Sequence, residues 1–429
     1  MLTAPGRRPK PGSTGGIMNH EMPQPATMPA PPGVAEGRPS LRLGQHLKRL
    51  REGYGYTLRK VEEKALTLGE AIDNSQLSRF EKGKALPSFD KLRALARIFN
   101  VSVQNFSDVL DLEELSAFRP DSEDVSELLA LGADLFARGE PGRAFVAFEK
   151  VVEIAEAAPD GPGRIERLAE ARWRMAASLK ALGKLGMCER ELREVLKLGP
   201  EVGARIRTRA LLNLSFVYRE LGDLYLAQVL ASETLEFATS AGDGAMQAAA
   251  LNTLGNIHEV SDLEQALSCY ERAYALVRDA ADSPELPVMV LTNLGGCLTK
   301  LHRLAEGMAR LQEAHARARE HGLRRIAALS ATRIAEALQA KGDLARAGRA
   351  FAESDALAGQ PDSPYHDILF LNSYHRWVAA REDGNGTREK IAFGRLRHLR
   401  ALLERRFPEV DEFDRWVTRH GRYAHEQRS

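Results

Sequence analysis

The apolar residues between positions 40 and 106 recur at helical spacing, in short blocks that polar residues and glycines separate. In the first block, leucines stand at i, i+4 and i+7, which places them on one face of a helix. Each block follows a residue whose side chain can cap a helix N-terminus. We therefore predict four or five short helices in this region. The expected N-caps are Ser40, Thr57, Asp73 and Ser88, and the expected apolar anchors include Leu43, Leu47, Leu50, Val61, Ala65, Leu77, Phe80, Leu92, Leu95 and Phe99.

The third of these helices, which follows Asp73, has two contrasting faces. Leu77 and Phe80 point toward the core, while the opposite face is entirely polar. The polar residues there are of the types that contact base edges and phosphates in DNA: arginine, glutamine, serine and lysine. Any solvated amphipathic helix also shows a polar outer face, so at this point a purely structural interpretation is equally good.

A large apolar residue followed by a small residue recurs from about residue 125 onward. Successive pairs are separated by 44, 39, 40, 40 and 40 residues. Such a period indicates stacked helical hairpins, because a single hairpin cannot bury its apolar face alone. We predict six repeats over 125–360 and a degenerate seventh from His366 to Phe407. The six pairs are Leu131-Gly132, Met175-Ala176, Leu214-Ser215, Leu254-Gly255, Leu294-Gly295 and Ile334-Ala335.

Composition completes the predicted division of the chain. Residues 1–40 contain nine prolines and six glycines, which is typical of a disordered segment. Residues 111–124 are rich in acidic side chains, and we interpret them as a linker. Residues 408–429 follow the last repeat as a tail or a further helix. With only 6% aromatic residues and many Ala, Leu, Arg and Glu, the whole chain is predicted to be all-α.

The net charge of +1 conceals an uneven distribution. Residues 41–106 carry thirteen Lys and Arg against seven Asp and Glu, whereas residues 107–429 carry forty-three against fifty. A short basic region attached to a long acidic one is typical of a nucleic-acid-binding domain joined to a body that does not bind nucleic acid. Chance clustering of charge is the alternative.

Several classes of protein are excluded by what the sequence lacks. It contains no apolar run of the length that a membrane span needs, and no apolar core follows its basic N-terminus as in a secretory signal. The three cysteines are too scattered for a disulfide framework or a zinc site. Nucleotide-binding and metalloprotease motifs are absent. We therefore expect a cytoplasmic protein that is not an enzyme and has no metal or cofactor.

The segment from Leu77 to Lys84, followed by Pro87-Ser88-Phe89 and by Leu92 to Ser102, closely resembles the Cro/C1-type (XRE) helix-turn-helix family. The resemblance covers about 65 residues and implies a small five-helix, lambda-repressor-like DNA-binding domain over 41–110. In that family an arginine that ends the first helix pairs with the glutamate of the recognition helix, and Arg51 and Glu81 match those positions. The connection over 65–72 is about five residues longer than usual in the family.

This resemblance implies that the second helix crosses the phosphate backbone while the third enters the major groove of double-stranded DNA. Together with the polar face described above, it assigns expected roles to individual side chains. We expect base contacts from Asn74, Ser75, Gln76 and Arg79, and phosphate contacts from Arg59, Lys60, Ser78, Lys82 and Lys84.

The repeats over 125–407 resemble the tetratricopeptide repeat, in which small residues let two antiparallel helices approach and an aromatic residue fills the gap. The 40-residue period exceeds the usual 34, so a HEAT-like pairing is the alternative fold. The resemblance implies an α-solenoid whose first helices line a groove for a peptide or protein. Simple solvent exposure of these polar residues is the competing interpretation. The expected groove residues are Arg209, Phe216, Arg219, Asn252, Asn256, Thr292, Lys300, Asn372 and Arg376.

The two resemblances together favour a sequence-specific transcriptional regulator that binds DNA as a homodimer and senses a peptide or protein in its groove, without membrane association. The architecture is similar to that of peptide-sensing regulators that join the same two modules. The alternative is a protein-interaction scaffold whose helix-turn-helix does not bind DNA.

Overall fold

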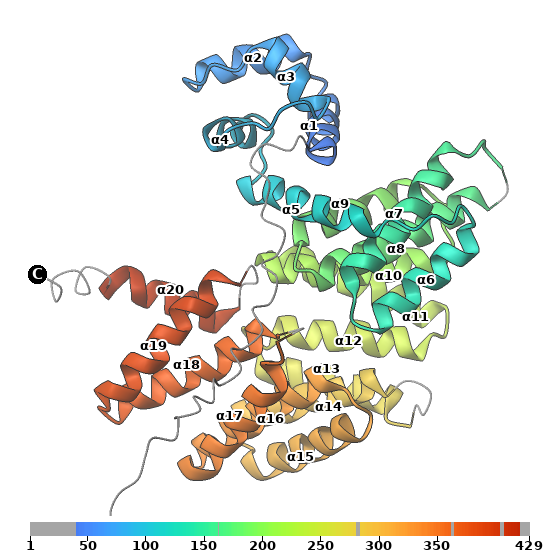
Figure 1. Ribbon diagram of the computed structural model, residues 1–429. Coiled ribbons are helices and arrows are strands. Elements are labelled where there is room, and N and C mark those ends of the chain that lie inside the picture. Colours follow the sequence, from blue (N-terminus) through green and yellow to red (C-terminus); the bar gives the residue numbers. More distant parts are fainter. Residues whose placement is uncertain (1–39, 162, 280–283, 362–363, 404–406, 421–429) are drawn as a thin grey trace, which may run out of the picture. The chain divides into compact units, whose positions relative to one another are not determined.

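The computed structural model describes residues 40–161, 163–279, 284–361, 364–403 and 407–420, and the regular structure in these ranges is entirely helical (Figure 1). The predicted all-α class is confirmed. The contacts divide the chain into two compact units, Met1–Asn100 and Val101–Ser429. The proline-rich segment predicted to be disordered, apart from Ser40, lies outside the described residues, as do the last nine residues.

The first unit contains four short helices, and most of their predicted N-caps are confirmed. Ser40 Oγ accepts from the Leu43 amide at 3.0 Å and Thr57 Oγ1 from the Lys60 amide at 3.1 Å. Ser88 is the N-cap residue of the fourth helix, as predicted, but its side chain makes no capping hydrogen bond. The helices are α1 (Leu41–Gly53), α2 (Leu58–Thr67), α3 (Asn74–Glu81) and α4 (Phe89–Ile98).

Helix α3 is held against α1 by an unusually close backbone contact. A Cβ atom placed on Gly44 would lie 2.5 Å from the carbonyl oxygen of Phe80 and 2.7 Å from that of Glu81. Only glycine permits this approach, because backbone atoms cannot move aside as a flexible side chain can. Leu77 and Phe80 are buried beneath α3. The opposite face of α3 is therefore directed away from the core of the unit.

The second unit begins with α5 (Val103–Glu114) and a 3₁₀ turn, η1 (Leu115–Phe118). Part of the segment expected to be an acidic linker is thus helical. Lys184, just before α9 (Leu185–Lys197), explains why: its Nζ lies 3.3 Å from Asp108 Oδ1 and 2.7 Å from Asp111 Oδ2. Lys184 and Asp108 are both buried, so this contact fixes α5 against the start of α9.

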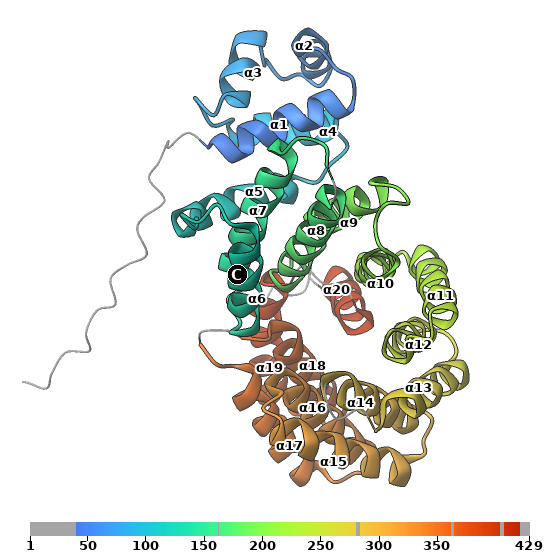
Figure 2. The ribbon, with the colours of Figure 1, turned by 90° about the vertical axis from the view of Figure 1, so that its right-hand side faces the viewer.

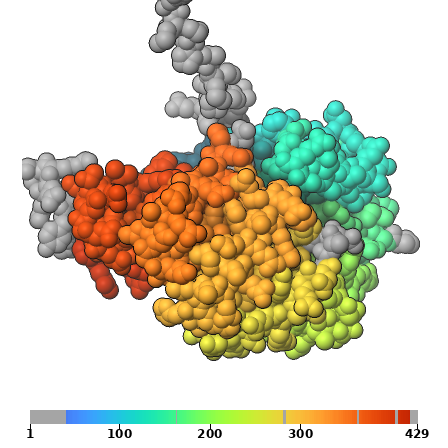
Figure 3. Space-filling view, turned by 90° about the horizontal axis from the view of Figure 1, so that it is seen from below, coloured from blue at the N-terminus to red at the C-terminus, as the bar shows by residue number. Residues whose placement is uncertain are grey.

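The remainder of the second unit is a curved array of consecutive helix pairs (Figures 1 and 2). Helices α10, α12, α14 and α16 contact one another along the inner side of the curve, and α11, α13, α15 and α17 lie outside them (Figure 2). The space-filling view shows the later repeats packed against one another in a continuous surface (Figure 3). The predicted helical repeats are confirmed, and α18 and α19 form the expected seventh pair. The pairs are α6 (Val125–Ala137) with α7 (Pro141–Ala157), α8 (Arg164–Ala181) with α9, α10 (Ala204–Leu221) with α11 (Leu224–Ser240), α12 (Gly244–His258) with α13 (Leu263–Val277), α14 (Glu285–Lys300) with α15 (Leu304–Glu320), α16 (Arg324–Ala340) with α17 (Leu344–Ala358), and α18 (His366–Glu382) with α19 (Gly386–Ala401).

Small residues allow the helices of a pair to approach, as the repeat pattern predicts. A Cβ atom on Gly255 would lie 2.5 Å from the Tyr270 ring, and one on Gly132 would overlap the Phe148 ring. Both rings are buried. The aromatic side chain of the second helix therefore fills the space that the missing side chain leaves, which is the packing expected of tetratricopeptide repeats.

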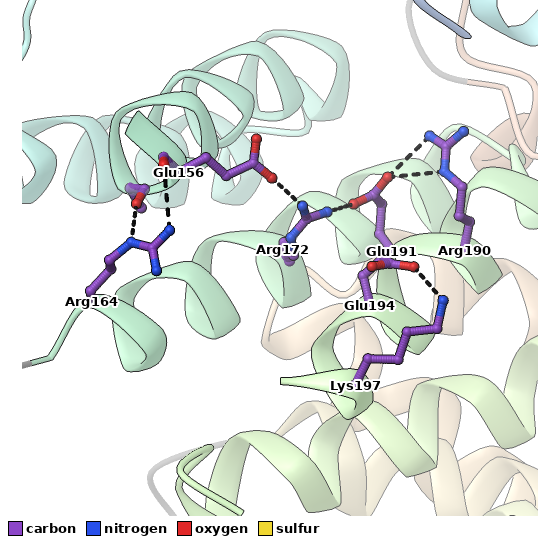
Figure 4. Close-up of polar contacts among 8 residues, drawn as sticks. Glu156, Arg164, Arg172, Arg190, Glu191, Glu194 and Lys197 are labelled. Atoms are coloured by element: carbon purple, nitrogen blue, oxygen red, sulfur yellow. Dashed lines mark hydrogen bonds and ion pairs between the residues drawn. The ribbon is translucent and has the colours of Figure 1, made fainter. Parts of the chain in front are cut away.

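Ion pairs also connect neighbouring pairs in the first part of the array (Figure 4). Arg172 on α8 binds Glu156 on α7, and its Nη1 donates to Glu191 Oε2 on α9 at 2.5 Å. Glu191 additionally accepts from Arg190 at 3.0 Å. Because Arg172 and Glu191 have exposed side-chain fractions of only 16% and 6%, this network is shielded from solvent and ties three helices together.

Candidate functional site

The first candidate site is the outer face of α3. Among the residues predicted to contact bases, Asn74, Ser75 and Arg79 are exposed, and Gln76 is half-buried. Asp73 Oδ1 accepts from the Gln76 amide at 2.7 Å, which fixes the first turn of the helix. The predicted phosphate-binding residues Lys82 and Lys84 are exposed just after α3, and Ser78 is half-buried. All seven of these residues therefore lie on α3 or directly after it, and each is exposed or half-buried.

One residue at this surface was not anticipated from the sequence. Lys91 on α4 donates from Nζ to Gln76 Oε1 at 2.7 Å. It therefore adds a positive charge beside α3 and orients the Gln76 amide, leaving the NH₂ group of Gln76 as a donor. The sequence alone does not indicate that a lysine in the first turn of the following helix belongs to this surface, because only the packing of α4 on α3 places it here.

The Arg51–Glu81 pair fixes the C-terminal end of α3, as the family resemblance implies. Arg51 Nε donates to Glu81 Oε1 at 2.6 Å and Nη2 donates to Oε2 at 2.9 Å, while Nη1 donates to the Tyr56 carbonyl at 3.0 Å. These hydrogen bonds to Glu81 raise the pKa of Arg51. A bidentate pair of this kind sets direction as well as distance, so it orients α3 relative to α1 and the start of α2.

Helix α2 presents the remaining predicted phosphate contacts. Arg59 and Lys60 are exposed, and both lie near Glu63, at 3.7 Å and 3.2 Å. Exposed pairs of this type contribute little, so either cation is able to exchange Glu63 for a phosphate. The long α2–α3 connection is partly taken up by α2 itself, which continues to Thr67, and Ile72 anchors its end with an exposed fraction of 2%.

The second candidate site is the inner side of the helical array. The predicted residues Arg219 and Asn256 line a cavity of about 920 Å³. Arg209 lies over the Trp173 ring at 5.0 Å, and Lys180 lies over the Phe216 ring at the same distance. Desolvation and the nearby Arg205 charge lower the pKa of Arg209.

Two other predicted cations are already paired. Lys300 Nζ lies 2.9 Å from Glu259 Oε1, and Arg376 Nη1 donates to Asp355 Oδ2 at 2.7 Å. Burial alone would raise the pKa of Glu259, but the positive charges of Lys300 and Arg333 outweigh it and the pKa is lowered. A ligand carboxylate would have to displace these partners.

Three predicted groove residues are corrected by the structure. Asn252, Thr292 and Asn372 have exposed fractions of 4%, 1% and 0%. Their polar atoms bond within the protein: Asn252 Oδ1 accepts from Asn293, Thr292 donates to the Val288 carbonyl, and Asn372 bonds Ser354. A shift of one residue along a helix moves a side chain from the groove face to the face buried against neighbouring helices. The repeat pattern does not distinguish these two faces.

A half-buried ionic cluster on the inner helices was also missed. Arg333 on α16 donates to Glu336 Oε2 at 2.9 Å, and His375 Nε2 of α18 lies 3.0 Å from Glu336 Oε1. Burial alone would raise the pKa of Glu336, but the positive charges of Arg333 and His375 outweigh this effect and the pKa is lowered. In the sequence these residues are indistinguishable from ordinary surface charges.

The described residues include neither a membrane-spanning helix nor a metal-binding cluster. None of the helices placed in those ranges is both long and apolar enough to cross a membrane. Likewise, the described side chains contain no group of three or more His, Cys, Asp or Glu able to hold a metal ion.

Comparison with known protein families identifies both modules. Residues 47–106 match the family model described as helix-turn-helix, and residues 207–279 match the one described as tetratricopeptide repeat. The chain therefore carries a helix-turn-helix domain followed by tetratricopeptide repeats, as expected. The second match favours that repeat over the HEAT-like alternative. Neither family model describes an enzyme. No curated protein sequence matches the chain.

Solved structures with a similar fold include two Rap proteins. A Rap protein complexed with Competence and Sporulation Factor is 17% identical, with a TM-score of 0.54 over 83% of this chain and 98% of that chain. The Rap conjugation gene regulator of the plasmid pLS20, in complex with the Phr* peptide, is 14% identical, with a TM-score of 0.52 over 85% and 98%. These values establish a shared helical-repeat fold.

A third similar structure is PlcR of Bacillus thuringiensis in complex with the peptide PapR7 and DNA. It is 17% identical over 78% of this chain and 98% of that chain. Its TM-score is 0.30.

Proposed function

We propose that this protein is a sequence-specific DNA-binding transcriptional regulator whose tetratricopeptide repeats sense a peptide or protein. The observation that carries the proposal is the exposed polar and basic face of α3, held in place by the Arg51–Glu81 pair within a segment that matches the helix-turn-helix family. In this fold such a face enters the major groove.

The side chains have distinct proposed roles. Arg79 forms bidentate hydrogen bonds to a guanine, and Asn74, Ser75 and Gln76 contact neighbouring base edges. Arg59, Lys60, Ser78, Lys82 and Lys84 bind phosphates and set the position of the domain on the duplex. Two copies of the chain bind half-sites about 34 Å apart, or a multiple of that distance, because helix-turn-helix dimers read one face of the duplex.

The sensing role rests on the repeats. A Rap protein with the same fold binds the Phr* peptide, which supports a peptide as the ligand class here. A ligand that prefers one curvature of the array shifts the population of array conformations, and thereby the separation of two DNA-binding domains in a dimer.

A second candidate function is a protein-interaction scaffold in which the helix-turn-helix does not bind DNA. The observation that favours it is the long connection from Leu68 to Asp73 between α2 and α3, which departs from the compact turn of the family.

Genome-wide mapping of the DNA bound by the full-length protein separates the two functions. A regulator yields discrete sites that share a sequence with half-sites at fixed spacing. A scaffold yields no enrichment over a control in which Arg79 and Lys82 are both changed to alanine. That result would contradict the proposed function.

A further inference from the structure

The last described helix, α20 (Pro408–His420), has two faces of opposite character. Its apolar face carries Val410 and Phe413, which are buried, together with Trp416. The Trp416 ring lies 5.1 Å from the Trp377 ring on α18, and 5.3 Å from the Phe393 ring on α19, in edge-to-face arrangements. Aromatic packing therefore fixes α20 to the last helix pair.

The other face of α20 is polar and lines the cavity of about 920 Å³. The opposite wall comes from the C-terminal ends of α10 and α12. In Figure 2, α20 lies within the curve of the array, facing these inner helices. The volume is at the upper end of the range for ligand pockets and is sufficient for a short peptide segment. The lining residues that matter below are Arg219, Asn256, Asp414, Arg415 and Arg419.

The carboxylates on the cavity wall already have partners. Asp414 accepts from Arg400 Nε and Nη2 at 2.9 Å each, and Glu220 accepts from Arg219 Nη2 at 2.6 Å. Asp411 also takes part in a polar interaction. The Asp414 and Glu220 carboxylates are therefore already paired with neighbouring arginines.

Two arginines on the same wall lack such partners. Arg415 and Arg419 are exposed and stand one turn apart on α20, so both point along the same side of the helix. Among the contacts of the described residues, Arg415 donates to the Asp411 carbonyl at 3.2 Å, and neither guanidinium forms an ion pair. Across the cavity, Arg219 Nε is buried without a hydrogen-bond partner.

We propose that α20 is one wall of the ligand site, and that Arg415 and Arg419, opposite Arg219, bind a carboxylate of a short peptide. The proposal rests on the peptide-sensing function proposed above and specifies its site. Guanidinium groups match carboxylates in geometry as well as charge. Asn256 lines the same cavity; its Oδ1 accepts from the Tyr270 hydroxyl at 2.9 Å, which leaves its NH₂ group as the donor toward a peptide carbonyl.

The experiment uses the purified full-length protein and three pools of random heptapeptides. The first pool has a free C-terminal carboxylate and no Asp or Glu. The second has an amidated C-terminus and contains Asp and Glu. The third is amidated and has no carboxylate. Retained peptides are quantified by mass spectrometry for the wild type, the double variant Arg415→Ala/Arg419→Ala, and the control Arg397→Ala, an exposed arginine of α19 that does not line the cavity.

We expect the wild type and Arg397→Ala to retain the first or the second pool about tenfold more than the third. Retention of the first pool identifies a C-terminal carboxylate as the bound group, and retention of the second identifies a side-chain carboxylate. The double variant loses this preference while keeping its melting temperature. The α20 site is overturned if the double variant retains the preferred pool as strongly as the wild type does. It is also overturned if the wild type retains the third pool as strongly as the other two. Either result leaves peptide sensing intact. Retention of none of the pools by folded wild type contradicts peptide sensing itself.

Discussion

At the scale of single residues, Gly44 controls how α3 is presented. The change Gly44→Ala adds a methyl group that would lie 2.5 Å from the Phe80 carbonyl oxygen. Because the obstacle is backbone, α1 and α3 must separate. We predict a loss of about 1–3 kcal/mol in the free energy of unfolding of the first unit, measured by chemical denaturation, together with weaker DNA binding.

Gly53 provides the matched control, since it lies in the same helix and a Cβ there would meet nothing within 4 Å. We expect Gly53→Ala to be neutral or to stabilise by up to about 1 kcal/mol. Equal destabilisation by both changes would show that the α1–α3 contact is not the cause.

Residue chemistry also explains how far the sequence alone could predict the sites. The N-caps at Ser40, Thr57 and Asp73 depend on local spacing, and they are correct. The Arg51–Glu81 pair was predicted only through the family resemblance. Asn252 and Thr292 were misplaced because burial depends on the rotation of each helix against its neighbours, which a repeat period leaves undetermined.

At the scale of elements, the contact between α5 and α9 is the most testable. Lys184 is 7% exposed and Asp108 is 5% exposed, and removal of one partner leaves a buried charge without compensation. We predict that Lys184→Met lowers the free energy of local opening of α5 by about 3–5 kcal/mol. Hydrogen exchange of the α5 amides measures this. The control is Lys197→Met, because Lys197 forms only an exposed pair with Glu194 at 2.7 Å.

The same contact gives a pH dependence of defined sign. Burial lowers the pKa of Lys184, but its bonds to Asp111 and Asp108 outweigh this and raise the pKa above the ordinary lysine value. The stabilisation is therefore complete below that ordinary value and disappears only as the pH rises through the raised pKa. Loss of α5 protection in wild type near neutral pH would contradict this account.

Helix α20 illustrates which elements were beyond prediction. The sequence indicated either a tail or a helix after residue 407, and a helix is present. The apolar spacing of α20 can be recognised from the sequence alone. The placement of Arg415 and Arg419 across the cavity from Arg219 cannot, because only the curvature of the whole array brings the two walls of the cavity together.

At the scale of the whole molecule, the chain combines a small domain that presents a polar helix with a long array that encloses a cavity. The division of charge along the sequence anticipated this, since the basic surplus falls on the first unit. Under the function proposed above, we expect long-range electrostatic attraction to a phosphate backbone to act on that unit and the acidic array to be repelled. We then expect sequence-specific recognition to depend on the base contacts proposed for α3.

The most direct test of the account measures binding of the full-length protein to its selected duplex and to a scrambled duplex, over a series of salt concentrations. Fluorescence anisotropy reports both affinities. We predict that Arg79→Ala costs about 1–3 kcal/mol on the selected duplex and little on the scrambled one, whereas Lys82→Ala weakens both alike and reduces the salt slope by about 1. Equal losses on the two duplexes for Arg79→Ala would contradict the claim that α3 reads the bases.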